Sequence, residues 1–390
     1  MIRHRFLRPP QVSQTARAGF ASLGLLRVAD EDPNTPGEFA LVRVSRRAMA
    51  TRFEVAIPFG RPDAVAAAED ALDLIDDLET QLTVYNDQSE VARLNATAAD
   101  GPVVVEDRLF DLLTTCSAWT RATEGAFDVS TGAIIRAWGF FRREGRIPTS
   151  RERVQAMAKT GTRHLILNPD ARSVKYRVAG LEINLGAVGK GYALDRAAEL
   201  LRDRWGIDSA LLHGGGSSVI AIGHPPGEPR GWPIRLKHPW QDGESLGTVW
   251  LRDQGLGTSA ATHQYFEYNG RKLGHLLDPR TARPAEGTAS ASATVPTAAE
   301  ADAMSTALFV LGVKGAERLT QTRPQLGAVV LSDPPTPPKG LGKQHPRLTP
   351  SSGTAAGRSV ASNSDTIANE LSTFNLAPAM YSLPESALLD

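Results

Sequence analysis

The stretch around which this chain is organised runs from Ile183 to Asp195 and reads INLGAVGKGYALD. Its pattern is typical of the end of a strand, a glycine-rich turn and the start of a helix. The glycines at 186, 189 and 191 would let the backbone approach another group closely, because glycine has no Cβ. Lys190 lies in the turn, and the first amide groups of the following helix would favour an anion. The stretch therefore indicates a phosphate site, although an ordinary strand-to-helix turn can have the same glycine pattern.

The spacing of the glycines excludes two common phosphate-binding motifs. They follow G-x-x-G-x-G rather than the dinucleotide-binding G-x-G-x-x-G, and the chain has no G-x-x-x-x-G-K-[ST]. A second glycine run, His213-Gly214-Gly215-Gly216, is similar to the oxyanion-hole sequence of esterases. A serine hydrolase of that class also needs G-x-S-x-G, which is absent, so this alternative is disfavoured.

Composition indicates an ordinary globular protein. The chain has 390 residues, of which 41% are hydrophobic and 22% are charged, and its 43 Lys and Arg balance 43 Asp and Glu. No global basic field would attract nucleic acid. The single cysteine, Cys116, excludes an intramolecular disulfide and a Cys-rich metal site, and its apolar helical surroundings predict a buried packing role. No apolar run reaches the roughly 18 residues that a transmembrane span requires.

The two ends differ in composition from the middle. Residues 1–38 begin with arginines and no acid, followed by a polar linker, which predicts a disordered leader or a weak targeting segment. The folded domain is expected over 39–332. Residues 333–390 are rich in Pro and Ser and are expected to form a disordered tail. The leader is no convincing signal peptide and offers no cysteine for a lipid anchor, so the compartment stays open. The sequence also leaves the oligomeric state open.

Hydrophobic periodicity predicts an α+β fold in one compact catalytic unit. Apolar residues recur every three or four positions from Val65 to Leu82, which predicts a helix opened by Pro62. The acids on its other face are interpreted as a solvated surface. Ser89 is expected to cap a short helix. Near the end of the domain, the pattern predicts two helices, 299–311 and 313–322, and a last strand at 328–331.

Seven short segments combine glycine, polar and charged residues in ways that packing does not require. In chain order they are Met49-Ala50-Thr51, Gly125 to Asp128, Asn184 to Asp195, the glycines at 214–215, Thr258-Ser259, His275 to Pro279, and Ala301 to Thr306. Together they resemble the FAD:protein FMN transferase family (ApbE-like), in the order typical of that family and over roughly residues 46–331. The resemblance implies an ApbE-like (T-fold-type) arrangement of mixed sheets with flanking helices.

The same resemblance implies a magnesium-dependent enzyme. Members of the family cleave FAD at its pyrophosphate, release AMP and attach FMN through its phosphate to a threonine of a target flavoprotein. Mg²⁺ is then the cofactor, and FAD is a substrate. Carried over by position, the residues that would contact FAD are Met49, Tyr85, Ala126, Phe127, Asp128, Asn184, Lys190 and Leu277. The resemblance places Mg²⁺ on Ala187, through its carbonyl, and on the side chains of Asp302 and Thr306.

These residue types fit the chemistry. Mg²⁺ prefers oxygen ligands and leaves positions for water and substrate phosphates. Asp302 and Thr306 are four residues apart and would share one face of a helix. The attacking threonine hydroxyl needs a proton acceptor. His275 is the first candidate because imidazole titrates near neutral pH, while Asp278 and Asp302 remain alternatives.

Each residue also has an ordinary structural interpretation. Asp278 before Pro279 could cap a turn, Asp128 could cap the next helix, and Tyr85 and Phe127 could be core or rim aromatics. The resemblance also leaves open an FAD pyrophosphatase, with water as the acceptor, because some members of the family hydrolyse FAD in this way. A non-catalytic FAD-binding protein is a further alternative, which three departures from the family pattern motivate.

Three positions depart from the family pattern. Asn184 stands where Asp is common, and Ala260 and Ala282 stand where Gly is usual. The amide keeps its hydrogen-bonding capacity but loses the charge, and the two alanines restrict the backbone. None of the three removes an expected metal ligand, but they leave room for reduced activity.

Overall fold

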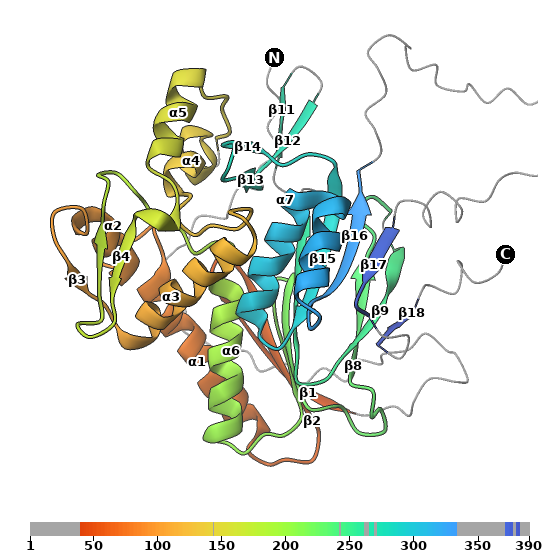
Figure 1. The fold of residues 1–390 in the computed structure, drawn as a ribbon. Coiled ribbons are helices and arrows are strands. Elements are labelled where there is room, and N and C mark those ends of the chain that lie inside the picture. Colours follow the sequence, from red (N-terminus) through yellow and green to blue (C-terminus); the bar gives the residue numbers. More distant parts are fainter. Residues whose placement is uncertain are drawn as a thin grey trace, which may run out of the picture.

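An eight-stranded sheet forms the centre of the fold (Figure 1) in the computed structural model, which describes residues 40–142, 144–241, 243–260, 265–268, 271–333, 371–376 and 380–382. Its strand order is β1-β2-β6-β7-β10-β15-β16-β17, and every neighbouring pair is antiparallel. The prediction of an α+β fold is confirmed. The strands are β1 (Leu41–Ala48), β2 (Thr51–Pro58), β6 (Ala210–Gly214), β7 (Ser218–Ile222), β10 (Gly255–Ala260), β15 (Thr288–Val295), β16 (Gly327–Ser332) and β17 (Leu371–Phe374).

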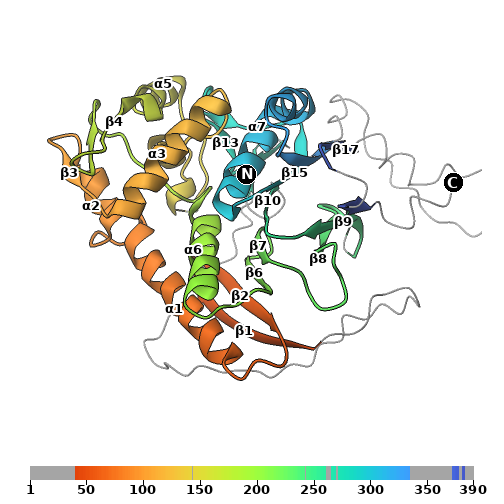
Figure 2. The same ribbon diagram turned by 60° about the horizontal axis from the view of Figure 1, so that its bottom comes forward.

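Three helices cover one face of this sheet (Figure 2): α1 (Ala64–Leu82), α6 (Gly189–Asp203) and α7 (Ala298–Thr322). The predicted helix after Pro62 is confirmed as α1, and its apolar positions are buried. Val65 is the exception. It is exposed because α1 turns Ala64, Ala67 and Ala68 toward the sheet.

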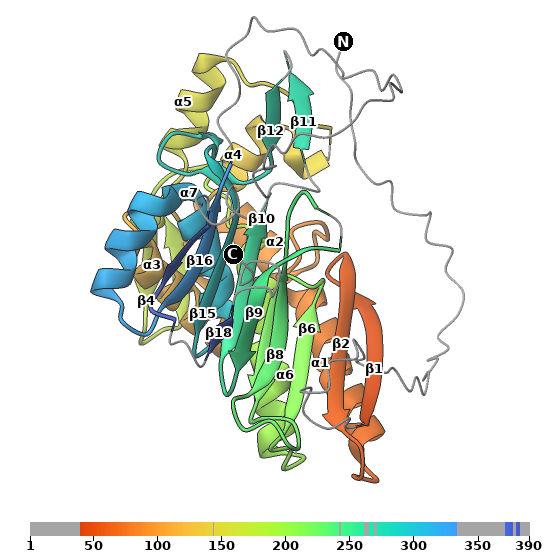
Figure 3. The same cartoon turned by 90° about the vertical axis from the view of Figure 1, so that its right-hand side faces the viewer.

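A small sheet covers the opposite face (Figure 3). Its strand order is β18 (Tyr381–Ser382), β9 (Ser245–Leu251) and β8 (Trp232–Lys237). Trp232 and Leu251 from this sheet share an apolar cluster with Val219 of β7 and Val329 of β16. The fold therefore has three layers: helices, a large sheet and a small sheet.

The expectation of a wholly disordered tail is wrong for residues 371–376 and 380–382. Leu371–Phe374 pairs with the edge strand β16, and Tyr381–Ser382 pairs with β9, so 328–331 is not the last strand. The side chain of Asn375 donates to the carbonyl of Thr320, in the last turn of α7, at 2.9 Å and to that of Leu326, between α7 and β16, at 3.1 Å. Composition missed these short strands because their partners are supplied by distant edges. The expected leader lies outside the described residues.

A side lobe carries α2 (Glu90–Thr97), α3 (Asp107–Ala122) and a sheet ordered β3 (Val103–Val104), β5 (Ser173–Tyr176), β4 (Leu165–Asn168). Ser89 caps α2 as predicted by accepting from Ala92 N–H at 3.0 Å, and Cys116 is buried in α3 as predicted.

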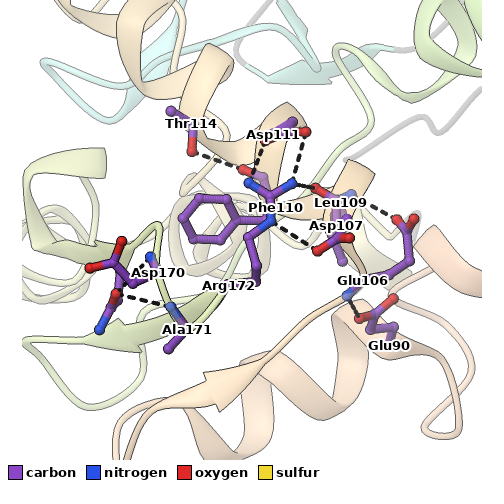
Figure 4. A network of polar contacts seen from close by, with 11 residues as sticks. Glu90, Glu106, Asp107, Leu109, Phe110, Asp111, Thr114, Asp170, Ala171 and Arg172 are labelled. Atoms are coloured by element: carbon purple, nitrogen blue, oxygen red, sulfur yellow. Dashed lines mark hydrogen bonds and ion pairs between the residues drawn. The ribbon is translucent and has the colours of Figure 1, made fainter.

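Arg172 attaches the β4–β5 hairpin of this lobe to α3 (Figure 4). It donates to Asp107 at 2.9 Å and to Asp111 at 2.7 Å, and its guanidinium lies 4.7 Å from the ring centroid of Phe110. One side chain thus joins the hairpin to the helix through two ion pairs and a cation–π contact.

A cap lies at one end of the sheet (Figure 1). It contains α4 (Gly132–Ala137), η1 (Phe140–Arg142), α5 (Ser150–Ala158) and the hairpins β11 (Tyr265–Tyr268)–β12 (Arg271–Gly274) and β13 (Leu277–Asp278)–β14 (Arg283–Pro284). It has its own apolar cluster, in which Trp138 donates its indole N–H to the carbonyl of Ala282 at 2.8 Å. The strands β11 and β12 pair as an antiparallel hairpin, and residues 269–270 between them lie outside the described residues.

The two helices expected at 299–311 and 313–322 are confirmed as the two parts of α7, which are separated at Gly312. Gly312 interrupts it with φ 64° and ψ −174°, a conformation that glycine adopts without a Cβ clash. In the described part of the chain, no helix combines the length and apolarity needed to cross a membrane.

Candidate functional site

Residues 181–185, before the glycine-rich turn, belong to no helix and to none of the sheets, although a strand end was expected there. The side chain of Asn95 replaces a neighbouring strand: its Oδ1 accepts from Ile183 N–H at 2.7 Å, and its Nδ2 donates to the Ile183 carbonyl at 2.8 Å. Tyr176 Oη donates to the same Oδ1 at 2.9 Å. The Asn95 side chain thus satisfies both backbone groups of Ile183, and Tyr176 helps to hold that side chain in place.

Asn184 shapes the turn itself. Its Oδ1 accepts from Gly186 N–H at 2.9 Å, and its own N–H donates to the Val129 carbonyl at 2.7 Å. Helix α6 then begins at Gly189, whose N–H donates to the Leu185 carbonyl. An amide oxygen makes the Gly186 contact as a carboxylate oxygen would, so this departure from the family pattern preserves the turn.

Gly191 brings α6 against α7. A Cβ at this position would collide with the carbonyl of Ala298, so only glycine allows the two backbones to touch. Its N–H donates to Asp302 Oδ2 at 2.8 Å. Gly191, one of the glycines expected to lie near a phosphate, therefore donates its N–H to another residue of the protein and orients the Asp302 carboxylate.

Asp302 is the most enclosed acid of the site, with 5% of its surface exposed. Its Oδ1 accepts from Ser218 Oγ at 2.7 Å, and its Oδ2 lies 3.9 Å from Lys190 Nζ. Burial raises the pKa of Asp302, and the Lys190 ammonium, the Ser218 hydroxyl and the Gly191 amide oppose that rise. The structure thus brings together Asp302 and Lys190, as predicted, and adds Ser218, which sequence reasoning missed.

A cluster of hydroxyls lies one turn further along α7. Thr306 Oγ1 donates to the backbone carbonyl of Asp302 at 3.0 Å. Ser259 Oγ, at the end of β10, lies 3.0 Å from Ser305 Oγ and 3.3 Å from Thr306 Oγ1. The Thr258-Ser259 segment and the Asp302–Thr306 segment therefore meet across the β10–α7 interface.

The donor set fits a magnesium ion that takes most of its oxygens from phosphates and water. Among the described residues, no three His, Cys, Asp or Glu side chains come together, so these side chains form no closed cage of ligands. Asp302 offers a buried carboxylate with a single ammonium group near it, and Thr306 offers a hydroxyl. Ala187 lies in the turn just before α6, half-buried.

The start of β2 lies beside the glycine run at the end of β6. Gly215 N–H donates to the Arg52 carbonyl at 2.9 Å, and His213 Nε2 lies 3.6 Å from Glu54 Oε1. His213, together with Arg43, lowers the pKa of Glu54 to about 2. The glycine run therefore connects β6 to β7 and contacts the backbone of β2. None of these contacts supports the esterase interpretation.

Met49 and Ala50 form the turn that precedes Thr51. They have φ values of 48° and 60°, so both residues occupy the left-handed region typical of a two-residue hairpin turn. Met49 is half-buried against the main core.

The segment from Gly125 to Asp128 is largely internal. Phe127 is 1% exposed and packs edge-to-face against Trp119, with ring centroids 6.3 Å apart, and Ala126 is also buried. The side chains of Ala126 and Phe127 thus belong to the core. Contact between these two residues and a ligand would have to come from their backbone.

Asp128 lines a cavity of about 360 Å³ together with Arg121, Arg163 and Arg280. Its carboxylate accepts from the N–H groups of Ser130 and Thr162, at 2.8 and 3.0 Å. Asp128 therefore stabilises a local turn and the Thr162 backbone, and the interpretation as a cap of the next helix is wrong, because α4 has Thr131 as its N-cap residue and no side-chain cap.

Tyr85 is the most exposed of the expected ligand contacts, at 66%. Its ring stacks on Phe141, with centroids 4.9 Å apart and planes 30° apart. The guanidinium of Arg136 lies 3.8 Å from the Phe141 centroid and pairs with Glu182. Sequence reasoning missed Phe141 and Arg136, because only the fold places them beside Tyr85.

The β13 segment contains the remaining expected residues. Asp278 forms a bidentate ion pair with Arg280, at 2.9 Å for both contacts, and its carbonyl accepts from Ala282 N–H. Its turn-forming interpretation is therefore confirmed. Leu277 is buried in the cluster of the cap, and His275 is half-buried just before β13.

A model of the ApbE family matches residues 49–330 of the chain. The chain is 31% identical over 289 residues to the FAD:protein FMN transferase of Escherichia coli K12, covering 70% of this chain and 80% of that protein. It is 30% identical over 311 residues to the FAD:protein FMN transferase of Salmonella typhimurium, covering 77% and 87%.

Solved structures give the same result. An ApbE protein of Thermotoga maritima has a TM-score of 0.68 and 26% identity, covering 75% of this chain and 94% of its own. The apo form of the Pseudomonas stutzeri flavinyl transferase ApbE has a TM-score of 0.67 and 26% identity, covering 76% and 92%. The expected fold is thereby confirmed.

Proposed function

The chain belongs to the ApbE family, and from this membership we propose that it is an FAD:protein FMN transferase, the name that its relatives carry. The observation that supports the proposal best is the buried carboxylate of Asp302 beside Lys190 at the α6–α7 contact. An acid and an ammonium group at the start of a helix suit a pyrophosphate that arrives with a metal ion.

The proposed reaction moves an FMN phosphoryl group. The hydroxyl oxygen of a threonine in the target flavoprotein forms a bond to the phosphorus of the FMN moiety. The bond between that phosphorus and the bridging pyrophosphate oxygen breaks, and AMP leaves with the oxygen. The hydroxyl proton passes to a basic group of the enzyme, so atoms and charges balance.

Asp302, Thr306 and the carbonyl of Ala187 would hold Mg²⁺, which when bound supplies positive charge to the pyrophosphate oxygens. Lys190 attracts the same oxygens from the first turn of α6. Ser218 and Gly191 donate to Asp302 and so keep its carboxylate in place. These residues together offer a carboxylate, a hydroxyl and an ammonium group to a metal-bound pyrophosphate.

Among the three candidates for the proton acceptor, His275 fits best. Asp278 is held by both nitrogens of Arg280, and Asp302 already accepts two hydrogen bonds in a buried position. His275 is half-buried at the entrance to β13, and imidazole accepts a proton near neutral pH.

Two further residues complete the proposed substrate site. Tyr85 offers an exposed aromatic face for the flavin ring. Asn184, in the turn that leads into α6, is proposed as a further contact to FAD. Met49, Asp128 and Leu277 are proposed as outer contacts, and Ala126 and Phe127 would contribute through their backbone.

The test is to incubate the purified chain with FAD, Mg²⁺ and a threonine-bearing target domain, and to follow covalent flavin fluorescence in denaturing gels. Labelled target together with AMP supports the transferase. FMN and AMP without labelling would identify a pyrophosphatase, and intact bound FAD would identify a binding protein. Asp302→Ala should lower the rate at least about 100-fold, and a fully active variant would contradict the metal assignment. The exposed Ala66→Ser on α1 serves as the control.

A further inference from the structure

Asp195, the last residue of the 183–195 stretch, has no part in the proposed reaction, yet its carboxylate contacts the helix that carries Asp302. Its Oδ1 accepts from Ala298 N–H at 2.7 Å, and its Oδ2 accepts from Ala299 N–H at 2.8 Å. These are the first two residues of α7, and such N–H groups have no partner within their own helix. Asp195 therefore caps α7 from α6.

The capping is reciprocal. Asp302 of α7 accepts from Gly191 N–H, in the first turn of α6. Gly191 and Asp195 are one helical turn apart on α6, and Ala298 and Asp302 are one turn apart on α7. Each helix thus supplies a carboxylate to the start of the other. Since Gly191 also brings the two backbones into contact, the helices have little freedom to slide.

We propose that Asp195 is a positioning residue for the metal-binding carboxylate of Asp302. By fixing the start of α7 against α6, it sets the separation between Asp302 and Lys190, which is 3.9 Å in the structure. The inference rests on the proposed function for the identity of the ligand, a metal-bound pyrophosphate. A displacement of about 1 Å at such a site can cost a factor of about 100 in rate.

The chain offers a matched control at the same helix end. Thr297 Oγ1 accepts from Glu300 N–H at 3.3 Å and caps α7 locally, whereas Asp195 caps it from another helix. Loss of either cap weakens the start of α7, but only loss of Asp195 also removes a contact between α7 and α6. Thr297→Ala and Asp195→Asn therefore separate helix stability from carboxylate position.

The experiment uses the full chain and both variants. Mn²⁺ replaces Mg²⁺, and its binding in the presence of FAD is followed by the electron paramagnetic resonance signal of free Mn²⁺. Thermal unfolding is measured alongside, as is hydrogen exchange of peptides covering 189–195 and 298–302. Asp195→Asn should weaken Mn²⁺ binding by about 10- to 100-fold and speed exchange in both peptides. Thr297→Ala should speed exchange only at the start of α7 and change Mn²⁺ binding by less than about 3-fold.

Three results would overturn the proposal: Asp195→Asn binds Mn²⁺ as wild type does, Thr297→Ala weakens Mn²⁺ binding equally, or the wild type binds no Mn²⁺ with FAD. The readout is independent of turnover. A wild type that binds Mn²⁺ and FAD but releases no AMP and labels no target would disprove the proposed function. The difference between the two variants would still decide the role of Asp195.

Discussion

Replacing Ala50 by glycine should stabilise the protein, although alanine-to-glycine changes usually destabilise. Ala50 lies in the β1–β2 turn with φ 60°, and its side chain is exposed. A left-handed conformation costs an L-residue about 1–2 kcal/mol. Glycine removes that cost but adds about 0.4–1 kcal/mol of unfolded-state entropy. The net expectation for Ala50→Gly is a gain of about 0.5–1 kcal/mol in the free energy of unfolding.

Two other alanines test the magnitudes separately. Ala282 has φ 50°, but its methyl group is fully buried in the cap, so glycine there also loses about 0.8 kcal/mol of burial. Ala282→Gly should therefore be close to neutral. Ala66 is exposed in the helix α1, where glycine costs about 1 kcal/mol. Replacement of alanine by glycine should thus raise the free energy of unfolding at position 50, leave it nearly unchanged at 282 and lower it at 66.

Urea unfolding followed by circular dichroism measures these differences, provided that the three variants share the slope of the wild type. The informative comparison is the order Ala50→Gly, Ala282→Gly, Ala66→Gly from most to least stable. If Ala50→Gly lost as much stability as Ala66→Gly, the backbone strain assigned to the β1–β2 turn would be refuted.

Three further changes have definite expected outcomes. Phe141→Ala removes the ring beneath Tyr85 and should weaken FAD binding by about 3- to 10-fold, as measured by flavin fluorescence quenching, while Phe141→Tyr should retain affinity. The pKa of Glu54 is lowered to about 2, so its contribution to stability is present above about pH 4.5 and is lost as the pH falls toward 2. Glu54→Gln should therefore reduce, by about 1–3 kcal/mol, the loss of unfolding free energy that accompanies acidification from about pH 4.5 to about pH 2. If the variant lost as much stability over this range as the wild type, the pairing of Glu54 with His213 would be contradicted. Asn375→Ala removes a donor from the carbonyls of Thr320 and Leu326 and should lower the free energy of unfolding in urea by about 1–3 kcal/mol. An unchanged free energy of unfolding would show that Asn375 contributes little to stability.

Local sequence patterns predicted most elements because their causes are local. The period of α1 and the Ser89 cap of α2 depend on residues within a few helical turns of one another. The expectations that were wrong depend on distant partners. The backbone of Ile183, before the glycine-rich turn, bonds to the side chain of Asn95 instead of to a neighbouring strand. Residues 371–374 form a strand because they pair with the edge strand β16.

The site shows the same division. Motif order alone indicated Lys190, Asp302 and Thr306, since each belongs to a short segment with a recognisable pattern. Ser218, Phe141 and Arg136 belong to no such segment, and their roles follow from where the fold places them. Phe127 belongs to a motif segment, yet its side chain lies in the core, so membership in a motif did not predict side-chain contact with a ligand.

By itself, the sequence determined the periods, caps and turns of this protein and the identity of its family, since these are encoded over short spans. Only the tertiary structure decided what the 183–195 stretch does. Gly191 and Asp302 are 111 residues apart, and Asp195 and Ala298 are 103 apart. Their hydrogen bonds exist because α6 and α7 pack backbone to backbone on the same face of the sheet. The glycine turn is thus part of a carboxylate site made by two helices, and no local pattern could have specified it.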